Sequence, residues 1–224
     1  MKIGIIGAGR MAQSFAWLAT RAGYRVMLSN SRGPDSIRPL AGQLGCEAGE
    51  VDEAAGFGDV IYAALPLQSY RAVPAAPLAG KLVLNPQNYF PQFGLLPELD
   101  RGTATTAELL ARHLPSSRVV KALNAILVED VVPDARPAGA PDRRALPIAG
   151  DDADARATTI ALLDRIGYDA VDAGPLAEGW RFERRRPAYC VRLGKAALAG
   201  VLEQTTRDAL VPEGHWRLQR ELRA

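Results

Sequence analysis

The chain opens on a pattern that permits very few folds. Residues 2–12 read KIGIIGAGRMA, which is an apolar run followed by Gly7-x-Gly9-x-x-Ala12 and the start of a helical periodicity. Gly7 permits a tight turn, Gly9 lets the backbone approach a ligand closely, and Ala12 is small enough for a helix to pack on a strand. The N-terminus of that helix presents free N–H groups and the positive end of its dipole. The pattern therefore predicts a strand, a phosphate-binding turn and a helix.

The rest of the chain alternates short apolar runs with helical patterns. With 224 residues, 48% of them hydrophobic, the chain can form one large domain, or one domain and a small lobe. Strands separated by helices predict a doubly wound, mostly parallel α/β sheet of the Rossmann kind. We expect strands at Lys2–Ile6, Arg25–Ser29, Asp59–Leu65, Lys81–Leu84, Arg118–Leu123, Ala145–Ala149 and Tyr168–Asp172, and helices at Met11–Ala22, Thr105–His113, Asp152–Ile166 and Ala188–Leu210.

A segment rich in Pro, Ala, Gly and charge, residues 133–144, predicts an exposed loop. We place a domain boundary at its start. Residues 1–132 would form the nucleotide-binding Rossmann domain. Residues 133–224 would form a small C-terminal lobe that ends in a long helix, completes an acceptor pocket and contributes to a dimer interface.

The residues that follow the second expected strand predict which dinucleotide binds. An NAD site carries an acid there, which accepts hydrogen bonds from the ribose 2′-OH. This chain has Asn30, Ser31 and Arg32 instead. Asn30 removes the repulsion of a 2′-phosphate, Ser31 can donate its hydroxyl, and Arg32 can make a charge-assisted contact. The segment therefore predicts NADP, although a solvated loop with an incidental arginine would look similar.

Composition excludes several classes of protein. The net charge of +2 and the pI near 8.6 give no indication of a nucleic-acid or membrane partner. Cys46 and Cys190 are far apart and follow no metal-binding or disulfide spacing, so we expect no metal site and a cytoplasmic location. No run approaches the roughly 20 apolar residues of a membrane span.

Six blocks along the chain follow one another in the order and spacing of one family. They are SNSRGP, DVIYAALP, KLVLNPQNYFP, TATTAELLARHLPSSRVVKALNAI, ALPIAGDDADA and YDAVDAGPLAEGWRFERRRPAY. On these blocks the chain resembles the coenzyme F420-dependent NADP oxidoreductases. The resemblance implies a Rossmann domain with a small C-terminal lobe, a homodimer, and hydride transfer between NADP(H) and a deazaflavin ring. The glycine loop GAGRMA is shorter than that of the archaeal members, which leaves F420 or a flavin open as the second substrate.

The expected site gathers at the carboxyl ends of the parallel strands. Leu65, Pro66 and the segments Asn85–Tyr89 and Asn124–Ile126 would line it. Strand-end packing would explain Leu65 and Pro66, and turn formation would explain Asn85 and Asn88 equally well. The resemblance implies that backbone groups of Ala125 and Ile126 hold the nicotinamide carboxamide, with Asn124 as a possible pocket residue. The cofactor-binding set that we predict is Gly7, Ala8, Gly9, Arg10, Met11, Asn30, Ser31, Arg32, Leu65, Pro66, Asn85, Ala125 and Ile126.

The chain is poor in acid–base groups. His113 and His215 are expected at the surface or at a helix end, and neither Lys121 nor Lys195 lies in a catalytic-lysine motif. Direct transfer between two rings needs alignment, whereas reduction of a carbonyl or imine needs a proton donor. We therefore expect an NADPH-dependent oxidoreductase with a flat deazaflavin or flavin-like acceptor. The alternatives are a reductase of a small carbonyl or imine, and a non-catalytic NADP(H) sensor.

The segment WRFERRRPAY, residues 180–189, concentrates arginines among aromatic residues. One interpretation is a wall of the acceptor pocket, aromatic for a flat ring and basic for an anionic tail. The other, slightly favoured, is a solvated arginine run beside a dimer contact.

Overall fold

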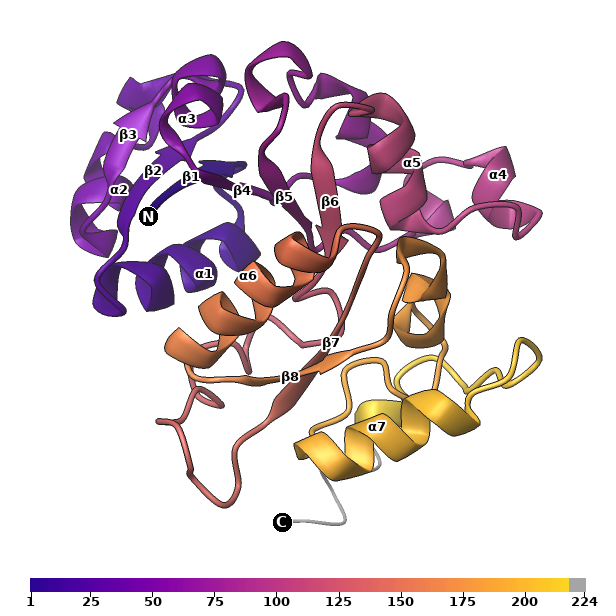
Figure 1. The fold of residues 1–224 in the computed structure, drawn as a ribbon. Helices are drawn as coiled ribbons and strands as arrows, with labels where there is room; N and C mark the ends of the chain where they lie inside the picture. The colour runs from indigo at the N-terminus through magenta and orange to yellow at the C-terminus, as the bar shows by residue number, and fades with distance from the viewer. Residues whose placement is uncertain (218–224) are drawn as a thin grey trace.

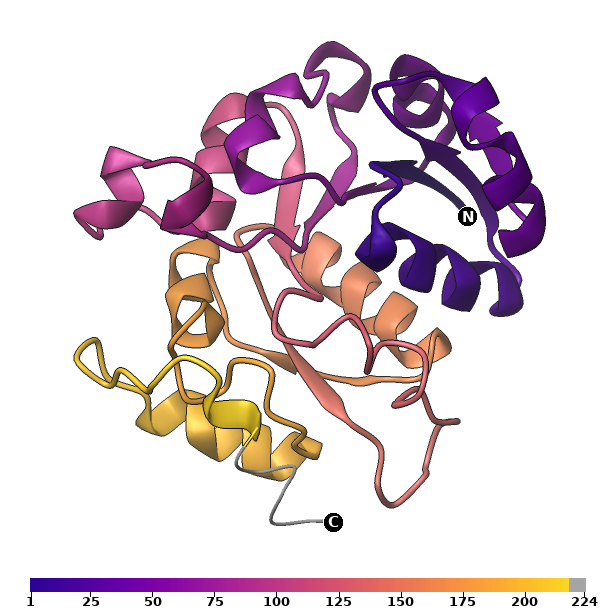
Figure 2. The same cartoon turned by 180° about the vertical axis from the view of Figure 1, so that it is seen from behind.

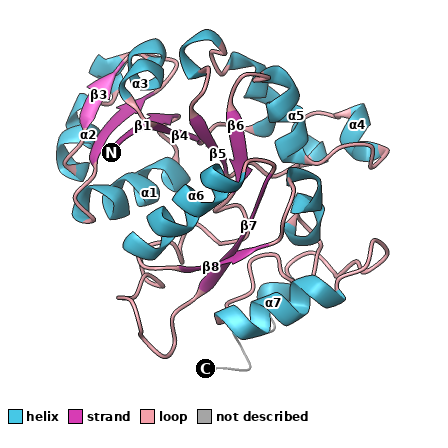
Figure 3. Cartoon of the chain, in the orientation of Figure 1, coloured by secondary structure: helices cyan, strands magenta, loops and turns pink. Residues whose placement is uncertain are grey.

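One eight-stranded sheet with helices on both faces organises the protein (Figures 1 and 3). The computed structural model describes residues 1–217. The strand order is β3-β2-β1-β4-β5-β6-β7-β8, and every pair is parallel except β6 with β7. The doubly wound fold class is therefore confirmed. The strands are β1 (Lys2–Ile6), β2 (Arg25–Ser29), β3 (Glu47–Gly49), β4 (Val60–Ala63), β5 (Leu82–Asn85), β6 (Arg118–Lys121), β7 (Ala145–Gly150) and β8 (Asp169–Asp172).

Helices cover both faces of the sheet because successive strand residues point to opposite faces and are apolar on both. Val60 and Tyr62 of β4 belong to the core under α1 and α6, whereas Ile61 and Ala63 belong to the core under α3 and α5. The α-helices are α1 (Arg10–Arg21), α2 (Arg38–Leu44), α3 (Val51–Phe57), α4 (Pro97–Asp100), α5 (Thr106–His113), α6 (Ala153–Arg165) and α7 (Lys195–Gln204). The 3-10 helices are η1 (Pro34–Ser36), η2 (Leu67–Ala72), η3 (Ala76–Leu78), η4 (Pro91–Phe93) and η5 (Leu176–Phe182).

The C-terminal third continues the sheet. β7 pairs with β6, and β8 pairs with β7, while α6 and α7 cover opposite faces of this extension. Seen from behind, the magenta segments around α4 and α5 lie above the orange and yellow C-terminal segments (Figure 2). The expected boundary between residues 132 and 133 thus lies in the connection between two paired strands. The division into two domains, the homodimer and the cytoplasmic location stay predictions, and residues 218–224 of the expected lobe lie outside the described residues.

All seven expected strands are present, with ends that shift by one or two residues. The short edge strand β3 was not predicted, because three residues that begin with an exposed glutamate and end with a glycine carry no strand pattern. The long final helix expected over Ala188–Leu210 is wrong. α7 spans only Lys195–Gln204, since the chain before Gly194 runs in a buried, irregular path with Cys190 at φ 60°.

No helix of the described residues is long and apolar enough to cross a membrane.

Tyr62 offers a test of the central core. Its ring lies 4.2 Å from that of Phe15, and its buried hydroxyl has no hydrogen-bond partner among the described residues. An unpaired buried hydroxyl costs about 1–3 kcal/mol, so Tyr62→Phe should raise the free energy of unfolding by about 1 kcal/mol in urea denaturation.

Tyr168→Phe is the matched control. The Tyr168 hydroxyl is also buried but donates to the Val131 carbonyl, so its removal should lower the free energy of unfolding by about 1 kcal/mol. Equal destabilisation by the two variants would show that the Tyr62 hydroxyl has a partner, such as a buried water.

Candidate functional site

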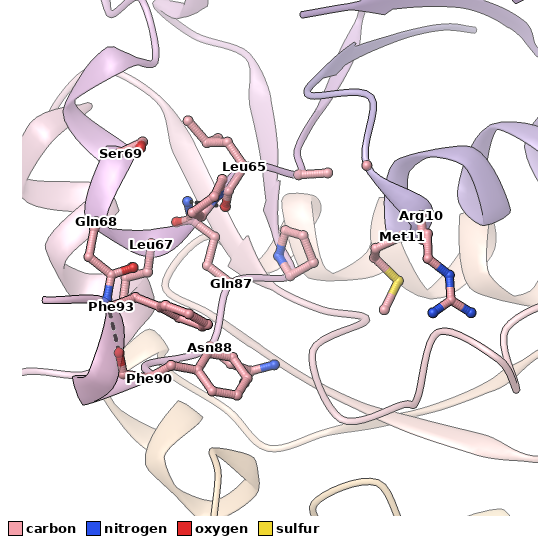
Figure 4. Close-up of a pocket in the computed structure, with 14 residues that line it drawn as sticks. Arg10, Met11, Leu65, Leu67, Gln68, Ser69, Gln87, Asn88, Phe90 and Phe93 are labelled. Carbon is pink, nitrogen blue, oxygen red and sulfur yellow. Dashed lines mark hydrogen bonds between the residues drawn. The ribbon is translucent and has the colours of Figure 1, made fainter. Parts of the chain in front are cut away.

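A cavity of about 650 Å³ opens where the direction of the winding reverses, between β1 and β4 (Figure 4). This crevice at the carboxyl ends of the strands is where open α/β sheets bind ligands. Three segments build it, and each follows one of the strands β1, β4 and β5. The lining residues are Gly9, Arg10, Met11, Ala64, Leu65, Pro66, Leu67, Gln68, Ser69, Pro86, Gln87, Asn88, Phe90 and Phe93.

The glycine loop forms the cavity's first wall. Gly7 has φ 112°, and a Cβ there would lie 2.2 Å from the Ala64 carbonyl oxygen, so only glycine fits where β1 passes the end of β4. Gly9 precedes α1, and a Cβ added to it would meet no atom within 4 Å. The N-terminus of α1 therefore faces open space that Gly9 keeps free of side chain. This cradle fits a pyrophosphate.

The Asn30–Arg32 segment lies at the end of β2, next to β1, outside the cavity itself. The Asn30 side chain is occupied: its Oδ1 accepts the Arg32 N–H at 3.0 Å, and its Nδ2 donates to the Ser36 hydroxyl at 2.9 Å. Asn30 therefore shapes the turn instead of pointing at a ligand. Ser31 and Arg32 are exposed, and the Arg32 guanidinium has no hydrogen-bond or ion-pair partner among residues 1–217. It is free to bind an anion.

The side chain of Gln87 connects the segment after β4 to the end of β5. Its side-chain Nε2 donates to the Leu65 carbonyl at 3.1 Å, and its Oε1 accepts from Asn85 Nδ2 at 3.0 Å. Asn85 is fully buried, and its Oδ1 accepts a hydrogen bond from the backbone N–H of Gln87. Asn85 thus holds Gln87 and is not among the residues that line the cavity, so its contact with the cofactor stays a prediction.

A buried lysine supports Gln87 from below. Lys121 has no exposed surface, and its Nζ donates to the Gln87 carbonyl at 3.1 Å and to the Thr106 hydroxyl at 2.5 Å. Glu183 lies 3.5 Å from the same Nζ and accepts both the N–H and the hydroxyl of Thr106. Burial lowers the pKa of Lys121, an effect that Glu183 opposes. The sequence offered no motif for this cluster.

The segment after β6 lies behind the cavity. Leu123 has φ 62°, a conformation rare for a branched residue and concentrated at functional sites. Asn124 and Asn88 exchange two bonds, from Asn88 Nδ2 to the Asn124 carbonyl at 2.9 Å and from Asn124 Nδ2 to Asn88 Oδ1 at 3.2 Å. Ala125 and Ile126 are buried, so the backbone contact to a carboxamide that the resemblance implies stays a prediction.

Most of the remaining predicted residues line the cavity, and one packs against the core instead. Gly9, Arg10, Met11, Leu65 and Pro66 line the cavity, whereas Ala8 packs against the neighbouring core and gives its carbonyl to Gln13. The cavity residues that sequence analysis did not identify are Ala64, Leu67, Gln68, Ser69, Phe90 and Phe93. Leu67, Gln68 and Ser69 lie on η2, whose sequence carries no ligand motif. Gln87, Phe90 and Phe93 lie in or just beyond the strand-end segment that was expected to line the site.

Neither histidine lines this cavity. His113 ends α5, where its Nε2 lies 2.8 Å from the Val73 carbonyl. His215 packs beside Trp216, and burial lowers its pKa. His113 therefore lies at the end of a helix, as expected, whereas His215 is partly buried, with both ring nitrogens shielded from solvent.

Residues 2–89 match the family model described as NADP oxidoreductase coenzyme F420-dependent, which confirms the resemblance over the N-terminal part of the chain. Metalloreductase STEAP3 of Rattus norvegicus is 30% identical over 185 residues, which are 81% of this chain and 36% of that protein. The chain therefore spans about a third of this relative.

Two solved structures share most of the fold. A hypothetical protein from Sinorhizobium meliloti is 27% identical with a TM-score of 0.75, over 87% of this chain and 96% of that one. A candidate F420-dependent NADP reductase from Arthrobacter sp. FB24 is 26% identical with a TM-score of 0.66, over 79% and 86% of the two chains. Both share the Rossmann-type fold of this chain, whereas the match to the NADP oxidoreductase family model is limited to residues 2–89.

The Lys121–Glu183 pair should respond unequally to loss of either partner. Glu183→Gln leaves a buried ammonium without its counter-charge, which costs about 3–5 kcal/mol of unfolding free energy. Lys121→Met removes the buried charge and leaves Glu183, whose side chain is 22% exposed, bonded to Thr106, so it should cost less than about half of that. Urea denaturation of both variants tests the order.

The pH dependence gives a second measurement. Because the pKa of Lys121 is lower in the folded than in the unfolded chain, the unfolded chain binds more protons between the two values. Its contribution therefore makes the unfolding free energy rise with pH in that alkaline window. Lys121→Met should lose this rise. An unchanged slope, or a larger loss from Lys121→Met than from Glu183→Gln, would contradict the assigned pair.

Proposed function

We propose that this chain, whose residues 2–89 carry the domain of the coenzyme F420-dependent NADP oxidoreductases, transfers a hydride directly between NADP(H) and a flat deazaflavin or flavin-like acceptor. The observation that carries the proposal is the chemistry of the cavity wall. None of its 14 lining residues is Asp, Glu, His, Lys, Cys or Tyr, and the one charged side chain is Arg10 at the glycine-loop end.

The residues present fit the dinucleotide. The space that Gly9 keeps free at the N-terminus of α1 accommodates a pyrophosphate, and Arg10 lies beside it. The unpartnered guanidinium of Arg32, one strand away, suits a 2′-phosphate. Between this end and the acceptor end, Met11, Leu65 and Pro66 provide apolar surface for the nicotinamide side. When bound, the cofactor supplies the hydride.

The protein's contribution would be alignment and exclusion of water. Gln87 and Asn88 hold their amides at the cavity by bonds to neighbouring backbone and side chains, so they can orient the edges of a ring without rearranging. Apolar residues on both sides exclude water from the transfer path. Reduction of a carbonyl or imine would also require a proton donor within reach. The lining residues of the described chain provide none.

A screen of acceptors tests the proposal. NADPH oxidation is followed by nicotinamide absorbance with F420, riboflavin, FMN, simple carbonyls and cyclic imines. Deuterium at the transferable position of NADPH should appear in the reduced deazaflavin and should slow transfer. Turnover of carbonyls or imines alone would contradict the proposal, as would NADPH binding without any turnover, which is the behaviour of a sensor.

Arg32→Ala tests cofactor choice. Arg32 has a partner only on the 2′-phosphate, and a charge-assisted hydrogen bond contributes about 1.5–3 kcal/mol, so NADPH should bind roughly 10- to 100-fold more weakly. NADH affinity, measured by the same fluorescence titration, should be nearly unchanged. Gly9→Val is the companion variant: its side chain enters the cradle and should remove binding of both cofactors from a folded protein. Equal losses of NADPH and NADH in Arg32→Ala would exclude the assigned role.

The two histidines test the mechanism. If hydride passes from ring to ring, His113→Ala and His215→Ala should keep kcat within a few-fold of the native value. Loss of a general acid or base would instead lower it roughly 10²–10⁴-fold. Steady-state kinetics with saturating NADPH measures this, with circular dichroism as the control for folding. A collapse of kcat in a folded variant that binds NADPH normally would mean that a proton donor has been missed.

A further inference from the structure

We infer that the acceptor is uncharged where it enters the cavity, so that this chain discriminates against acceptors with a phosphate near the ring. The inference rests on the proposed function and narrows its substrate class. Three observations support it. They are the position of charged side chains around the cavity, the contacts of the neighbouring arginines, and the residues that line the acceptor end.

Charge is confined to one end of the cavity. Figure 4 shows Arg10 and Met11 on one side, and Gln68, Phe90 and Phe93 on the other. Arg10, at the N-terminus of α1, lies where the pyrophosphate of the dinucleotide is expected. The opposite end is lined by neutral amides, a hydroxyl and aromatic rings. A cofactor bound through the glycine loop therefore leaves the acceptor a space that no cation of residues 1–217 lines.

The arginines of residues 180–189 do not supply one. Arg184, the nearest to the cavity wall, donates to the Tyr89 carbonyl at 2.8 Å, pairs with Glu213 at 2.6 Å and lies 4.3 Å from the Phe90 ring centre. It supports Phe90 and does not line the cavity. Arg185 is exposed and is not among the residues that line the cavity.

Two arginines of residues 180–189 lie over the ring of Trp180. Arg181 and Arg186 lie 4.7 and 5.0 Å from its ring centre, and both donate to carbonyls of the segment that follows α7, or of its last turn. These guanidinium groups therefore hold the C-terminal segment together. Arg181 and Arg186 therefore neither line the cavity nor lie unpaired in solvent, whereas the dimer contact expected beside this segment stays a prediction.

The acceptor end is built for a flat, neutral ring. Phe90 and Phe93 lie 6.0 Å apart at the rim, and Phe93 is 70% exposed, so an aromatic face is open to a ligand. Gln68 donates through its Nε2 to the carbonyls of Phe90 and Gly94, which leaves its Oε1 to accept from a ring N–H. Ser69 adds a hydroxyl beside it.

A phosphate would lose hydration at this end without gaining a cation, which is unfavourable. Riboflavin and FMN share one ring and differ in one phosphate, so they form a direct test. With saturating NADPH, kcat/KM should be about tenfold or more higher for riboflavin than for FMN, the size of one missing charge-assisted contact. Quenching of ring fluorescence in the presence of NADP⁺ should show the same order of affinity. F420 and its phosphate-free chromophore should behave likewise.

Ser69→Arg provides the converse test. The substitution places a cation at the acceptor end, so the ratio of kcat/KM for FMN to that for riboflavin should rise about tenfold. Ala72→Arg is the matched control, because Ala72 is exposed at the end of the same 3-10 helix and does not line the cavity. Its ratio should equal that of the native protein.

The outcomes separate the two proposals. Equal or better use of FMN by the native protein, or a ratio that Ser69→Arg does not raise above that of Ala72→Arg, overturns the inference and leaves flavin-type reduction intact. Failure of every flavin and deazaflavin to bind and to oxidise NADPH overturns the proposed function, and the inference with it.

Discussion

The hydrogen bonds of Gln87 hold the candidate site in shape. Parallel strands bring several loops to one edge of the sheet but do not fix their spacing. Gln87 fixes it by bonding the loop after β4 through Leu65 and the end of its own strand through Asn85. Because Asn85 is buried, these bonds are sheltered from water and stronger for it. The Gln87 amide thus joins the two loops that line the crevice after β4 and β5.

The same residue connects the site to the C-terminal third of the chain. Lys121 bonds the Gln87 carbonyl, and Glu183 approaches the Lys121 ammonium from the segment after η5. A buried ammonium is costly without a counter-charge, and here Glu183 provides the ion pair and Thr106 accepts a hydrogen bond from it. Folding of the C-terminal segment and formation of the cavity wall are therefore linked, although the two lie far apart in sequence.

The two ends of the cavity differ in charge. The glycine-loop end combines a helix N-terminus with Arg10, and Arg32 lies one strand further, so an anionic dinucleotide is favoured there. The other end offers aromatic rings and amides, with Arg184 neutralised by Glu213 behind Phe90. Such asymmetry would orient the cofactor and restrict the second substrate with no catalytic side chain.

Local patterns in the sequence determined the fold class, the glycine loop and the Asn30–Arg32 turn, because each depends on neighbouring residues: alternating apolar positions, glycines without a Cβ, a cation where an acid is usual. Five of the thirteen residues in the cofactor-binding set that we predicted line the cavity, and they belong to the glycine loop and the segment after β4. Tertiary structure alone decided the rest. Asn85 is buried and hydrogen-bonded to Gln87. Lys121 pairs with Glu183, which lies 62 positions further along the chain, and arginines near Trp180 donate to backbone carbonyls. Burial and pairing depend on which distant segments meet, and no local pattern encodes that.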